Sequence, residues 1–470
     1  MGGSIVTRLV AVSNRVASPR SDPKSAGGLA VGVMAALEEY GGVWFGWNGK
    51  TTHGEPGDAD FEKAGNVTYA TIDLNQRSYD LYYNGFSNTS LWPVCHYLLE
   101  FFRYDHREYD EYRRVNALFA RKLLPILQPD DVIWVHDYHL IPLASELRRA
   151  GVTQPIGFFL HVPFPDIEML RVLPVYRQLI RSLCAYDVVG FHTPSDLRAF
   201  NEAVAQEDIG GIEHADRRKK DPGRKTQADV FPIGINVEDC QKIAMESVER
   251  DNVKRMVSHL HNRDLIIGVD RLDYSKGLEH RFDAIETLFE NYFEHRNKVS
   301  FIQIAPTTRS GVRAYDDIRN NLEQATGRIN GKFADIDWVP IRYLNRAFDR
   351  PTLMGFFREA SVGLVTPIRD GMNLVSKEFV ASQDPENPSV LVLSTMAGAA
   401  QELTDALLIN PYDIDSVADN IHKALTMPLG ERQERHQGMI EILKKNDITA
   451  WRTRFLDALL KIRERIRLAS

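Results

Sequence analysis

The sequence predicts an α/β protein built from two Rossmann-like halves, and three observations favour this class. The chain has 470 residues, which at about 150 residues per domain suggests two or three domains. Short runs rich in Val, Ile and Phe recur between longer stretches with helical spacing, as is typical of parallel sheets that are buried on both faces. A charged stretch, residues 210–227, precedes Phe231–Gly234, where one half could end and the other begin.

The apolar runs predict two sets of strands. We expect the first set at Arg8–Ser13, Val43–Trp47, Val67–Ile72, Val132–Val135, Ile156–His161 and Asp187–His192. We expect the second set at Asp229–Phe231, Leu265–Val269, Val299–Ile304, Val362–Val365, Val390–Leu393 and Ala406–Ile409. Apolar stripes at helical spacing run from Leu278 to Tyr292 and from Trp451 to Ile466, and both predict helices that pack on a core. Ligands of such sheets bind beyond the carboxyl ends of the strands, so two facing halves would share one cleft.

The composition excludes several classes of protein. Lys+Arg 57 against Asp+Glu 64 gives a net charge of −7, which argues against a nucleic-acid partner. No apolar run approaches the roughly 18 residues of a membrane span, and residues 1–6 do not have the pattern of a signal peptide. Cys95, Cys184 and Cys240 are far apart in the sequence, which predicts reduced thiols. We therefore expect a cytoplasmic protein with neither a nucleic-acid nor a membrane partner.

Several familiar motifs are incomplete. Gly49-Lys50-Thr51 ends like a phosphate-binding P-loop, but Trp44 stands where the motif needs glycine. No G-x-G-x-x-G follows the first strand, and the chain contains no G-x-S-x-G, so a dinucleotide cofactor and the commonest hydrolase elbow are poorly supported. His136, His139 and His161 lack the spacing of a metal-binding motif. We expect no cofactor and no metal.

The segment Arg369–Phe379 predicts a phosphate site in the second half. Asp370 follows a strand, and Gly371 allows a ligand to approach the backbone closely. The amides of Leu374 and Val375 would open a helix, whose N-terminus favours an anion. Glu378, one turn later, could accept hydrogen bonds from a ribose. An ordinary loop before a helix that carries a carboxylate is the alternative.

A second basic element, Asp270–Gly277, follows the strand Leu265–Val269. Arg271 and Lys276 are placed at a corner between a strand and a helix, where two cations could neutralise a diphosphate without a metal ion. Charge-assisted hydrogen bonds of this kind contribute about 1.5–3 kcal/mol each. A surface ion pair between Arg271 and Asp273 is the alternative.

The first half carries aromatic, carboxylate and imidazole side chains near the ends of its predicted strands. The segments concerned are Ser13-Asn14-Arg15, Gly27-Gly28, Tyr82–Phe86, Leu91-Trp92-Pro93, Trp134–His139 and Phe159–Pro165. Aromatic rings with neighbouring polar groups suit a sugar, which offers apolar faces and hydroxyls. Each aromatic residue alone could equally belong to the core, but together they favour a sugar-phosphate site.

These segments, with Ala305–Arg309 and the junction Phe231–Ile235, resemble the trehalose-6-phosphate synthases of bacterial type. That family consists of retaining glycosyltransferases with the GT-B fold, and the likeness runs from residue 8 to beyond residue 400. It implies an N-terminal acceptor domain at 1–233, a nucleotide-sugar domain at 234–449, and a C-terminal helix, about 450–470, that returns to the first domain. It also suggests a homo-oligomer, either a dimer or a homotetramer.

The resemblance implies transfer of glucose from UDP-glucose to glucose 6-phosphate with retention, which gives α,α-trehalose 6-phosphate and UDP. It assigns catalysis to Asp370, Arg271, Lys276 and His161. It places the donor against Gly27, Gly28, Arg271, Lys276, Phe348, Asp370, Leu374, Val375 and Glu378. It places the acceptor against Arg15, Tyr83, Trp92, Asp137 and Arg309, with the two arginines on the phosphate, since a planar guanidinium suits bidentate phosphate recognition.

The residues also leave alternatives open. No carboxylate pair stands out as nucleophile and acid. The resemblance implies transfer on the front face of the sugar, without a covalent intermediate. Another GT-B transferase, such as a glycogen synthase, would not need the phosphate clamp of Arg15 and Arg309. A sensor that binds a UDP-sugar or a sugar phosphate without catalysis is a further alternative, and the intact segment Asp370–Glu378 and the paired cations argue against it. The donor nucleotide could be UDP, GDP or ADP.

Overall fold

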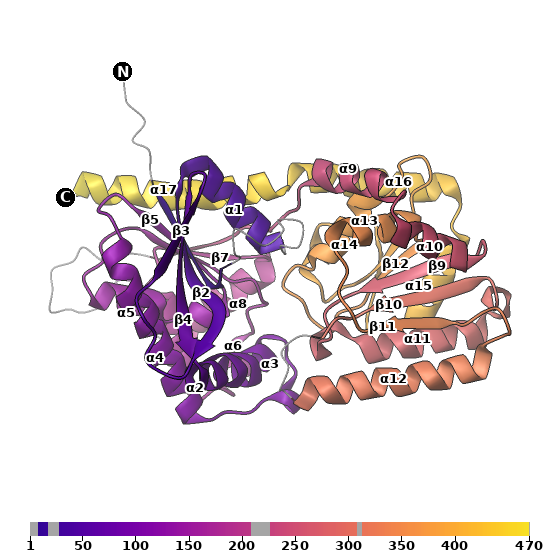
Figure 1. Ribbon diagram of the computed structural model, residues 1–470, viewed down its shortest axis with the longest axis horizontal. Coiled ribbons are helices and arrows are strands. Elements are labelled where there is room, and N and C mark those ends of the chain that lie inside the picture. Colours follow the sequence, from indigo (N-terminus) through magenta and orange to yellow (C-terminus); the bar gives the residue numbers. More distant parts are fainter. Residues whose placement is uncertain (1–7, 17–27, 208–225, 308–312, 470) are drawn as a thin grey trace, which may run out of the picture. The chain divides into compact units, whose positions relative to one another are not determined.

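The computed structural model describes residues 8–16, 28–207, 226–307 and 313–469. The chain divides into two compact units. The first unit comprises Met1–Pro232 with Trp451–Ser470, and the second comprises Ile233–Ala450. Each unit contains a mainly parallel sheet with helices packed against it (Figure 1).

The described part of the first unit contains an eight-stranded sheet in the order β3-β4-β2-β1-β5-β6-β7-β8. Its strands are β1 (Leu9–Arg15), β2 (Gly42–Thr52), β3 (Asp60–Ala64), β4 (Val67–Asn75), β5 (Val132–His136), β6 (Ile156–Phe159), β7 (Val188–Phe191) and β8 (Gln227–Val230). Neighbouring strands are parallel, except that β3 runs antiparallel to β4. The central strands β5, β6 and β7 are buried along their whole length, as expected when helices cover both faces of a parallel sheet.

The C-terminal helix packs on this sheet. The α-helices in the described part of the first unit are α1 (Gly28–Tyr40), α2 (Gln76–Ser78), α3 (Trp92–Cys95), α4 (His106–Leu123), α5 (Leu143–Arg149), α6 (Ile167–Leu170), α7 (Tyr176–Leu183), α8 (Pro194–Gln206) and most of α17 (Ile448–Ala469), and a π-helix covers Tyr79–Leu91. The Phe455 ring of α17 stacks on Trp134 of β5, with centroids 5.0 Å apart. A Cβ atom at Gly157 of β6 would lie 2.8 Å from the Phe455 ring, so glycine admits the helix there. The expected return of the C-terminal helix to the first half is confirmed.

The second unit contains a six-stranded parallel sheet in the order β11-β10-β9-β12-β13-β14. Its strands are β9 (Asp264–Val269), β10 (Val299–Ile304), β11 (Ile341–Leu344), β12 (Val362–Val365), β13 (Val390–Ser394) and β14 (Leu407–Ile409). Its helices are α9 (Val237–Ser247), α10 (Asp251–Leu260), α11 (Leu278–Asn291), α12 (Arg313–Phe333), α13 (Arg350–Glu359), α14 (Leu374–Ser382), α15 (Ile414–Thr426) and α16 (Leu429–Lys445). Figure 1 shows α11 and α12 on one side of the sheet, with α13 and α14 on the other.

The helical stripe predicted from Leu278 is confirmed. Phe282, Ile285 and Phe289 of α11 are buried in one apolar cluster with side chains of the sheet and of α12 and α15. Helix α11 begins directly after Gly277, which has φ +62, and a Cβ there would lie 2.3 Å from the Thr366 carbonyl oxygen. Glycine is therefore required at the corner that leads into α11.

The strand predictions were correct for β10 and β12, whose bounds agree with the sequence analysis. The grouping of Asp229–Phe231 with the second set of strands was wrong, because β8 pairs with β7 in the first sheet, on the first-domain side of the expected boundary at residue 233. Two strands, β3 and β11, were not predicted. Strand β3 is largely exposed at the edge of its sheet and carries Asp60, Glu62 and Lys63 instead of an apolar run, so it lacks the signal on which the other predictions rested.

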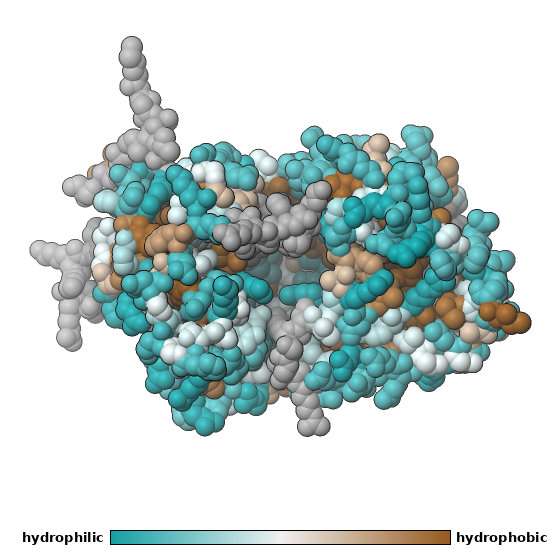
Figure 2. All heavy atoms as spheres, viewed as in Figure 1, coloured by the Kyte–Doolittle hydropathy of each residue, from teal (hydrophilic) through white to brown (hydrophobic). Residues whose placement is uncertain are grey.

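The surface of the described residues is mainly polar on the face shown in Figure 2. The large exposed apolar side chains include Phe61 on β3 and Met245 on α9. No helix in the described ranges combines the length and the hydropathy that are needed to span a bilayer.

Candidate active site

The corner after β9 holds the two predicted cations of the second unit. Asp273 shapes it: its carboxylate accepts hydrogen bonds from the Ser275 amide at 3.0 Å and from the Ser275 hydroxyl at 2.9 Å. The Arg271 side chain is exposed, whereas Lys276 is buried. The corner therefore presents one cation to solvent and holds the other in a fixed place.

A buried arginine of α11 holds the same corner in place through contacts in the core. Arg281 of α11 is fully buried, and its NH2 group lies 2.8 Å from the Asp270 carboxylate. The guanidinium also donates to Gln303 at 2.8 Å and to the Thr366 hydroxyl at 3.0 Å. Burial raises the pKa of Asp270, while the positive charge of Arg281 opposes the rise. The ends of β9, β10 and β12 are thereby joined by one polar network.

Lys276 contacts Asp370 at the carboxyl ends of β9 and β12. The Lys276 Nζ atom donates to Asp370 Oδ2 at 2.5 Å, and the Asn373 side chain donates from Nδ2 to the same oxygen at 3.0 Å. The backbone around Asp370 is held as well, because its amide donates to the Met396 carbonyl and its carbonyl accepts from the Gly398 amide. The structure thus brings together Lys276 and Asp370, which the sequence placed on two separate segments.

Helix α14 begins beside this pair. Asn373 has a left-handed backbone, with φ 72, and its side chain caps the helix by accepting from the Ser376 amide at 3.0 Å. The amides of Leu374 and Val375 lie in the first turn, where no intrahelical partner is available to them. The prediction that these amides open a helix is confirmed. A helix N-terminus next to a lysine is a favourable place for a phosphate.

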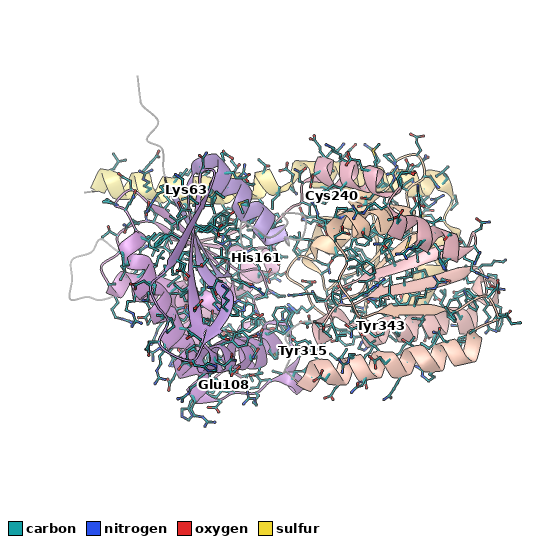
Figure 3. The ribbon with its side chains drawn as sticks, in the orientation of Figure 1. Lys63, Glu108, His161, Cys240, Tyr315 and Tyr343 are labelled. Carbon is teal, nitrogen blue, oxygen red and sulfur yellow. The ribbon has the colours of Figure 1, made fainter. Side chains whose placement is uncertain are left out.

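Glu378 lies one turn further along α14 and faces Arg350. The Arg350 Nε atom is 3.6 Å from Glu378 Oε1, and the same guanidinium donates to Asp239 at 2.7 Å and to Cys240 Sγ at 3.1 Å. Burial raises the pKa of Glu378, and Arg350 counteracts the rise. Burial also raises the pKa of Cys240, labelled on α9 in Figure 3, to about 12, so Cys240 remains a thiol. Phe348 is half-buried just before α13 and packs against Phe356.

In the first unit, three histidines gather at the ends of neighbouring strands. His136 ends β5, while His161 and His192 follow β6 and β7, and His161 is labelled in Figure 3. His136 Nδ1 and His161 Nε2 are 3.2 Å apart. Burial holds the pKa of both rings well below the ordinary histidine value, and each is lowered further by a neighbouring histidine. Both rings are therefore neutral near pH 7.

Asp137 occupies the turn between these histidines. It has a left-handed backbone, with φ 78, which is uncommon for a residue with a side chain. Its carboxylate accepts from the Tyr138 amide at 3.0 Å and from the His161 amide at 3.2 Å. Backbone strain of this kind persists only where the surrounding structure holds the residue in place, and strained residues cluster at active sites.

Arg15 and Tyr83 both lie near the Trp47 ring. The Arg15 guanidinium carbon is 5.9 Å from the centre of the Trp47 ring, and the Tyr83 ring is 6.4 Å from it. Tyr83 also stacks on His139, with centroids 5.5 Å apart. The Arg15 side chain is exposed at the end of β1. A cation and an aromatic wall therefore occur together at this end of the first sheet.

The remaining predicted site residues are two glycines, a tryptophan and an arginine. Gly28 is the first residue of α1. Trp92 is 5% exposed and packs against His96 and Tyr138, so most of its ring belongs to the core. Gly27 and Arg309 lie outside the described residues.

Sequence reasoning missed several residues that shape these two sites. Arg281 and Arg350 were not singled out, although each pairs with a residue of a recognised segment. Asn373 and Asp273 lay inside the quoted segments, and their position just before a helix was a usable capping signal.

The chain is similar to proteins of one known family. The family model described as glycosyltransferase family 20 matches residues 7–461. A relative from Klebsiella pneumoniae named trehalose-6-phosphate synthase is 49% identical over 464 residues, which cover 98% of this chain and 96% of the relative.

Solved structures are also similar. A UDP-forming α,α-trehalose-phosphate synthase from Burkholderia xenovorans, in complex with glucose 6-phosphate, has a TM-score of 0.91 and 50% identity, and the match covers 96% of this chain and 100% of that one. An Escherichia coli protein bound with UDP-2-fluoro glucose has a TM-score of 0.90 and 48% identity, and the match covers 96% and 99% of the two chains. The predicted fold class, GT-B with two Rossmann-like parts, is confirmed. The chain belongs to glycosyltransferase family 20.

Proposed function

We propose that this enzyme transfers glucose from UDP-glucose to glucose 6-phosphate with retention of configuration, and so makes α,α-trehalose 6-phosphate and UDP for trehalose biosynthesis. The observation that carries the proposal is the contact of Lys276 with Asp370 beside the first turn of α14. This contact brings a cation, helix amides and a hydrogen-bond acceptor for a sugar together at the carboxyl ends of the central strands. Two similar proteins support the choice of substrates: a UDP-forming trehalose-phosphate synthase in complex with glucose 6-phosphate, and an Escherichia coli protein bound with UDP-2-fluoro glucose.

The donor diphosphate binds at Arg271 and Lys276, with the amides of Leu374 and Val375. An ammonium group has three donors, so Lys276 can bond to Asp370 and to a phosphate oxygen at the same time. The exposed Arg271 can reach a ligand without a change in the core. Charge-assisted bonds from both cations, together with the helix dipole, favour the two negative charges of a diphosphate.

The rest of the donor is recognised by groups on either side of this anion site. Glu378 accepts hydrogen bonds from the ribose hydroxyls, and the half-buried Phe348 lines the uracil pocket. Asp370, His161, Gly27 and Gly28 face the donor glucose. Because His161 is neutral, it acts as a hydrogen-bonding group and adds no charge near the anomeric carbon.

The acceptor is held by Arg15 and Arg309 at its phosphate and by Tyr83, Trp92 and Asp137 at its sugar. Arg15 is exposed beside the Trp47 and Tyr83 rings, and such rings suit the apolar face of a sugar. Trp92 acts mainly by packing, since little of its ring is exposed.

The transfer proceeds on one face of the glucose ring. The bond from the anomeric carbon to the diphosphate oxygen breaks, and the acceptor hydroxyl oxygen forms its bond to that carbon from the same side. The departing phosphate oxygen takes the proton of the acceptor hydroxyl. Arg271 and Lys276 stabilise the negative charge that grows on the diphosphate, which is the type of electrostatic contribution that usually dominates catalysis.

Three further properties belong to the proposal. The reaction needs no metal ion and no cofactor, because two side-chain cations serve the leaving group. The enzyme works in the cytoplasm as a homo-oligomer, either a dimer or a homotetramer. The three cysteines are free thiols, which fits a reducing compartment.

The deciding experiment measures UDP release from UDP-glucose, with and without glucose 6-phosphate, in buffer that contains a chelator, and identifies the sugar product. Release that depends on the acceptor and yields trehalose 6-phosphate is expected. Binding of both ligands without release would instead favour a sensor. Transfer to a glucan would point to a glycogen synthase-like enzyme, and release only from GDP- or ADP-glucose would correct the donor.

A further inference from the structure

Two histidines and a glutamate converge in the second unit, away from the donor residues. Glu294 and His295 belong to the short helical turn Phe293–His295 after α11, and His422 lies on α15. His295 Nε2 is 2.9 Å from His422 Nδ1, and Glu294 Oε1 is 3.8 Å from the same nitrogen. One ligand atom from each of the three residues lies within 4.8 Å of the other two. We refer to Glu294, His295 and His422 as the histidine cluster.

The imidazole rings of the histidine cluster are held in place before any ligand arrives. Tyr292 stacks on His422 with centroids 4.0 Å apart and an angle of 8° between the rings. The Tyr292 hydroxyl donates to Asp419 of α15 at 2.7 Å, which fixes the tyrosine as well. His295 is only 7% exposed, and its amide donates to the Tyr292 carbonyl. Binding at this place would cost little ordering of side chains.

Burial of His295 favours the neutral form of its ring, which is the form that binds a metal. Burial lowers the pKa of His295, and His422 and Lys298 lower it further. The negative charges of Glu294 and Asp264 act in the opposite direction. In the 2.9 Å contact one ring donates its N–H to the other, so on metal binding that proton moves to the other nitrogen of the same ring. Both rings then present a lone pair, and no proton is lost from the pair.

We propose that the histidine cluster binds a divalent transition-metal ion of the zinc class and thereby joins the end of α11 to α15. Two imidazole nitrogens and one carboxylate oxygen form a donor set that zinc uses in proteins, with a water molecule as the fourth ligand. Bonds of about 2.0–2.1 Å in a tetrahedron place ligand atoms roughly 3.3 Å apart. The separations of 2.9 and 3.8 Å lie on either side of that value, so small side-chain shifts would complete the site.

The position of the histidine cluster makes the metal structural, with no part in glycosyl transfer. Helix α11 begins two residues after Lys276 and ends at Asn291, three residues before Glu294. Its 14 residues separate the two ends by about 20 Å at 1.5 Å per residue. The metal would therefore stabilise the unit at the end of α11 that lies away from the donor residues.

The test uses the whole protein after removal of metals with a chelator. Zn²⁺ is expected to raise the unfolding midpoint by several degrees, because a ligand that binds only the folded state stabilises it. Co²⁺ is expected to bind with one-to-one stoichiometry and to give the visible absorption bands of a tetrahedral ion. UDP release is expected to be the same with and without Zn²⁺, so failure of the proposed glycosyl transfer would not affect this result.

Two variants of the histidine cluster and one control make the test specific. His422→Gln keeps a polar partner for His295 and removes a metal ligand, so it should abolish the Co²⁺ bands and the Zn²⁺ shift. Glu294→Gln changes an exposed side chain and should weaken Zn²⁺ binding at least about tenfold, since even loss of an outer partner costs that much. His106→Ala removes an exposed histidine of the first unit and should respond as wild type. Equal Zn²⁺ and Co²⁺ responses in wild type, His422→Gln and Glu294→Gln would overturn the proposal.

Discussion

Arg281 and Asp270 form an ion pair in the interior of the second unit, with 2.8 Å between the NH2 group and the carboxylate, and the Arg281 side chain is fully buried. The pair joins the first turn of α11 to the end of β9. The segment between the two residues carries Arg271 and Lys276, so the pair controls where both cations lie. A buried charge without its partner is strongly unfavourable.

The first prediction concerns this pair. Arg281→Met should lower the free energy of unfolding by roughly 3–5 kcal/mol, because it leaves the Asp270 carboxylate buried and unpaired. Urea unfolding followed by circular dichroism measures the change. The control is Arg319→Met on α12, where the exposed arginine lies 3.8 Å or more from its acidic neighbours and the cost should be within about 0.5 kcal/mol. Equal losses in the two variants would contradict the role given to Arg281.

The second prediction separates the donor cation from the acceptor clamp. Arg271→Ala should reduce kcat about tenfold to hundredfold, as expected for loss of a charge-assisted bond of about 1.5–3 kcal/mol to the leaving group. Arg309→Ala should mainly raise the KM for glucose 6-phosphate. Steady-state kinetics with each substrate varied in turn distinguishes the two effects. An unchanged kcat with a raised acceptor KM in Arg271→Ala would move Arg271 to the other site.

The sequence was sufficient to predict the central strands of each sheet and the turns that follow them. Strands β10 and β12 are mainly apolar and buried at every residue, as is typical of a parallel strand covered on both faces. Strand β3 could not be found in this way, because an exposed edge strand needs no apolar run. The error at β8 has another cause: the order of strands along the chain does not decide which sheet a strand joins.

The sequence predicted the segments that form the candidate site. It did not predict the contacts between those segments. Asp370 and Lys276 are 94 residues apart in the chain and bond to each other. Arg350 lies on α13, outside every recognised segment, and reaches Glu378 on α14. Arg281 lies on the buried face of α11 beside Phe282, although an arginine is ordinarily exposed. Such pairs depend on how helices pack across a sheet, and local patterns do not encode that packing.

The third prediction is that Arg350 acts through Glu378, as a positioning residue that keeps the Glu378 carboxylate ionised. The ionised Glu378 carboxylate is the form that accepts hydrogen bonds from a ribose, and Arg350 lowers its pKa against the effect of burial. In Arg350→Met the pKa should rise, so kcat/KM for UDP-glucose should begin to fall at a higher pH on the acid side. The kcat at saturating donor should change little.

The control for Arg350 is Asp239→Asn, which removes another partner of the guanidinium and leaves Glu378 in contact with it. Its pH profile should follow that of wild type. Arg350→Lys keeps the charge and should restore part of the acid side of the profile. An Arg350→Met profile that coincides with wild type would show that the contact has no part in donor binding.

The last prediction concerns the neutral histidines of the first unit. Burial lowers the pKa of His136 and His161 in the folded state, so below the ordinary histidine pKa of about 6.5 the unfolded chain binds more protons than the folded one. Their contribution to stability is therefore complete above that pH and is lost as the pH falls. Each such group adds a slope of at most about 1.4 kcal/mol per pH unit to the free energy of unfolding.

The variant His136→Gln should reduce this slope in urea unfolding measured from about pH 7 to about pH 5, the range in which an ordinary histidine titrates. The slope should not vanish, because His161 remains and burial also lowers the pKa of His295 and His436. Slopes are compared, since the substitution also changes the stability at every pH. His106→Gln removes an exposed histidine and should keep the wild-type slope. If His136→Gln also kept it, the neutral pair would not be a source of acid sensitivity.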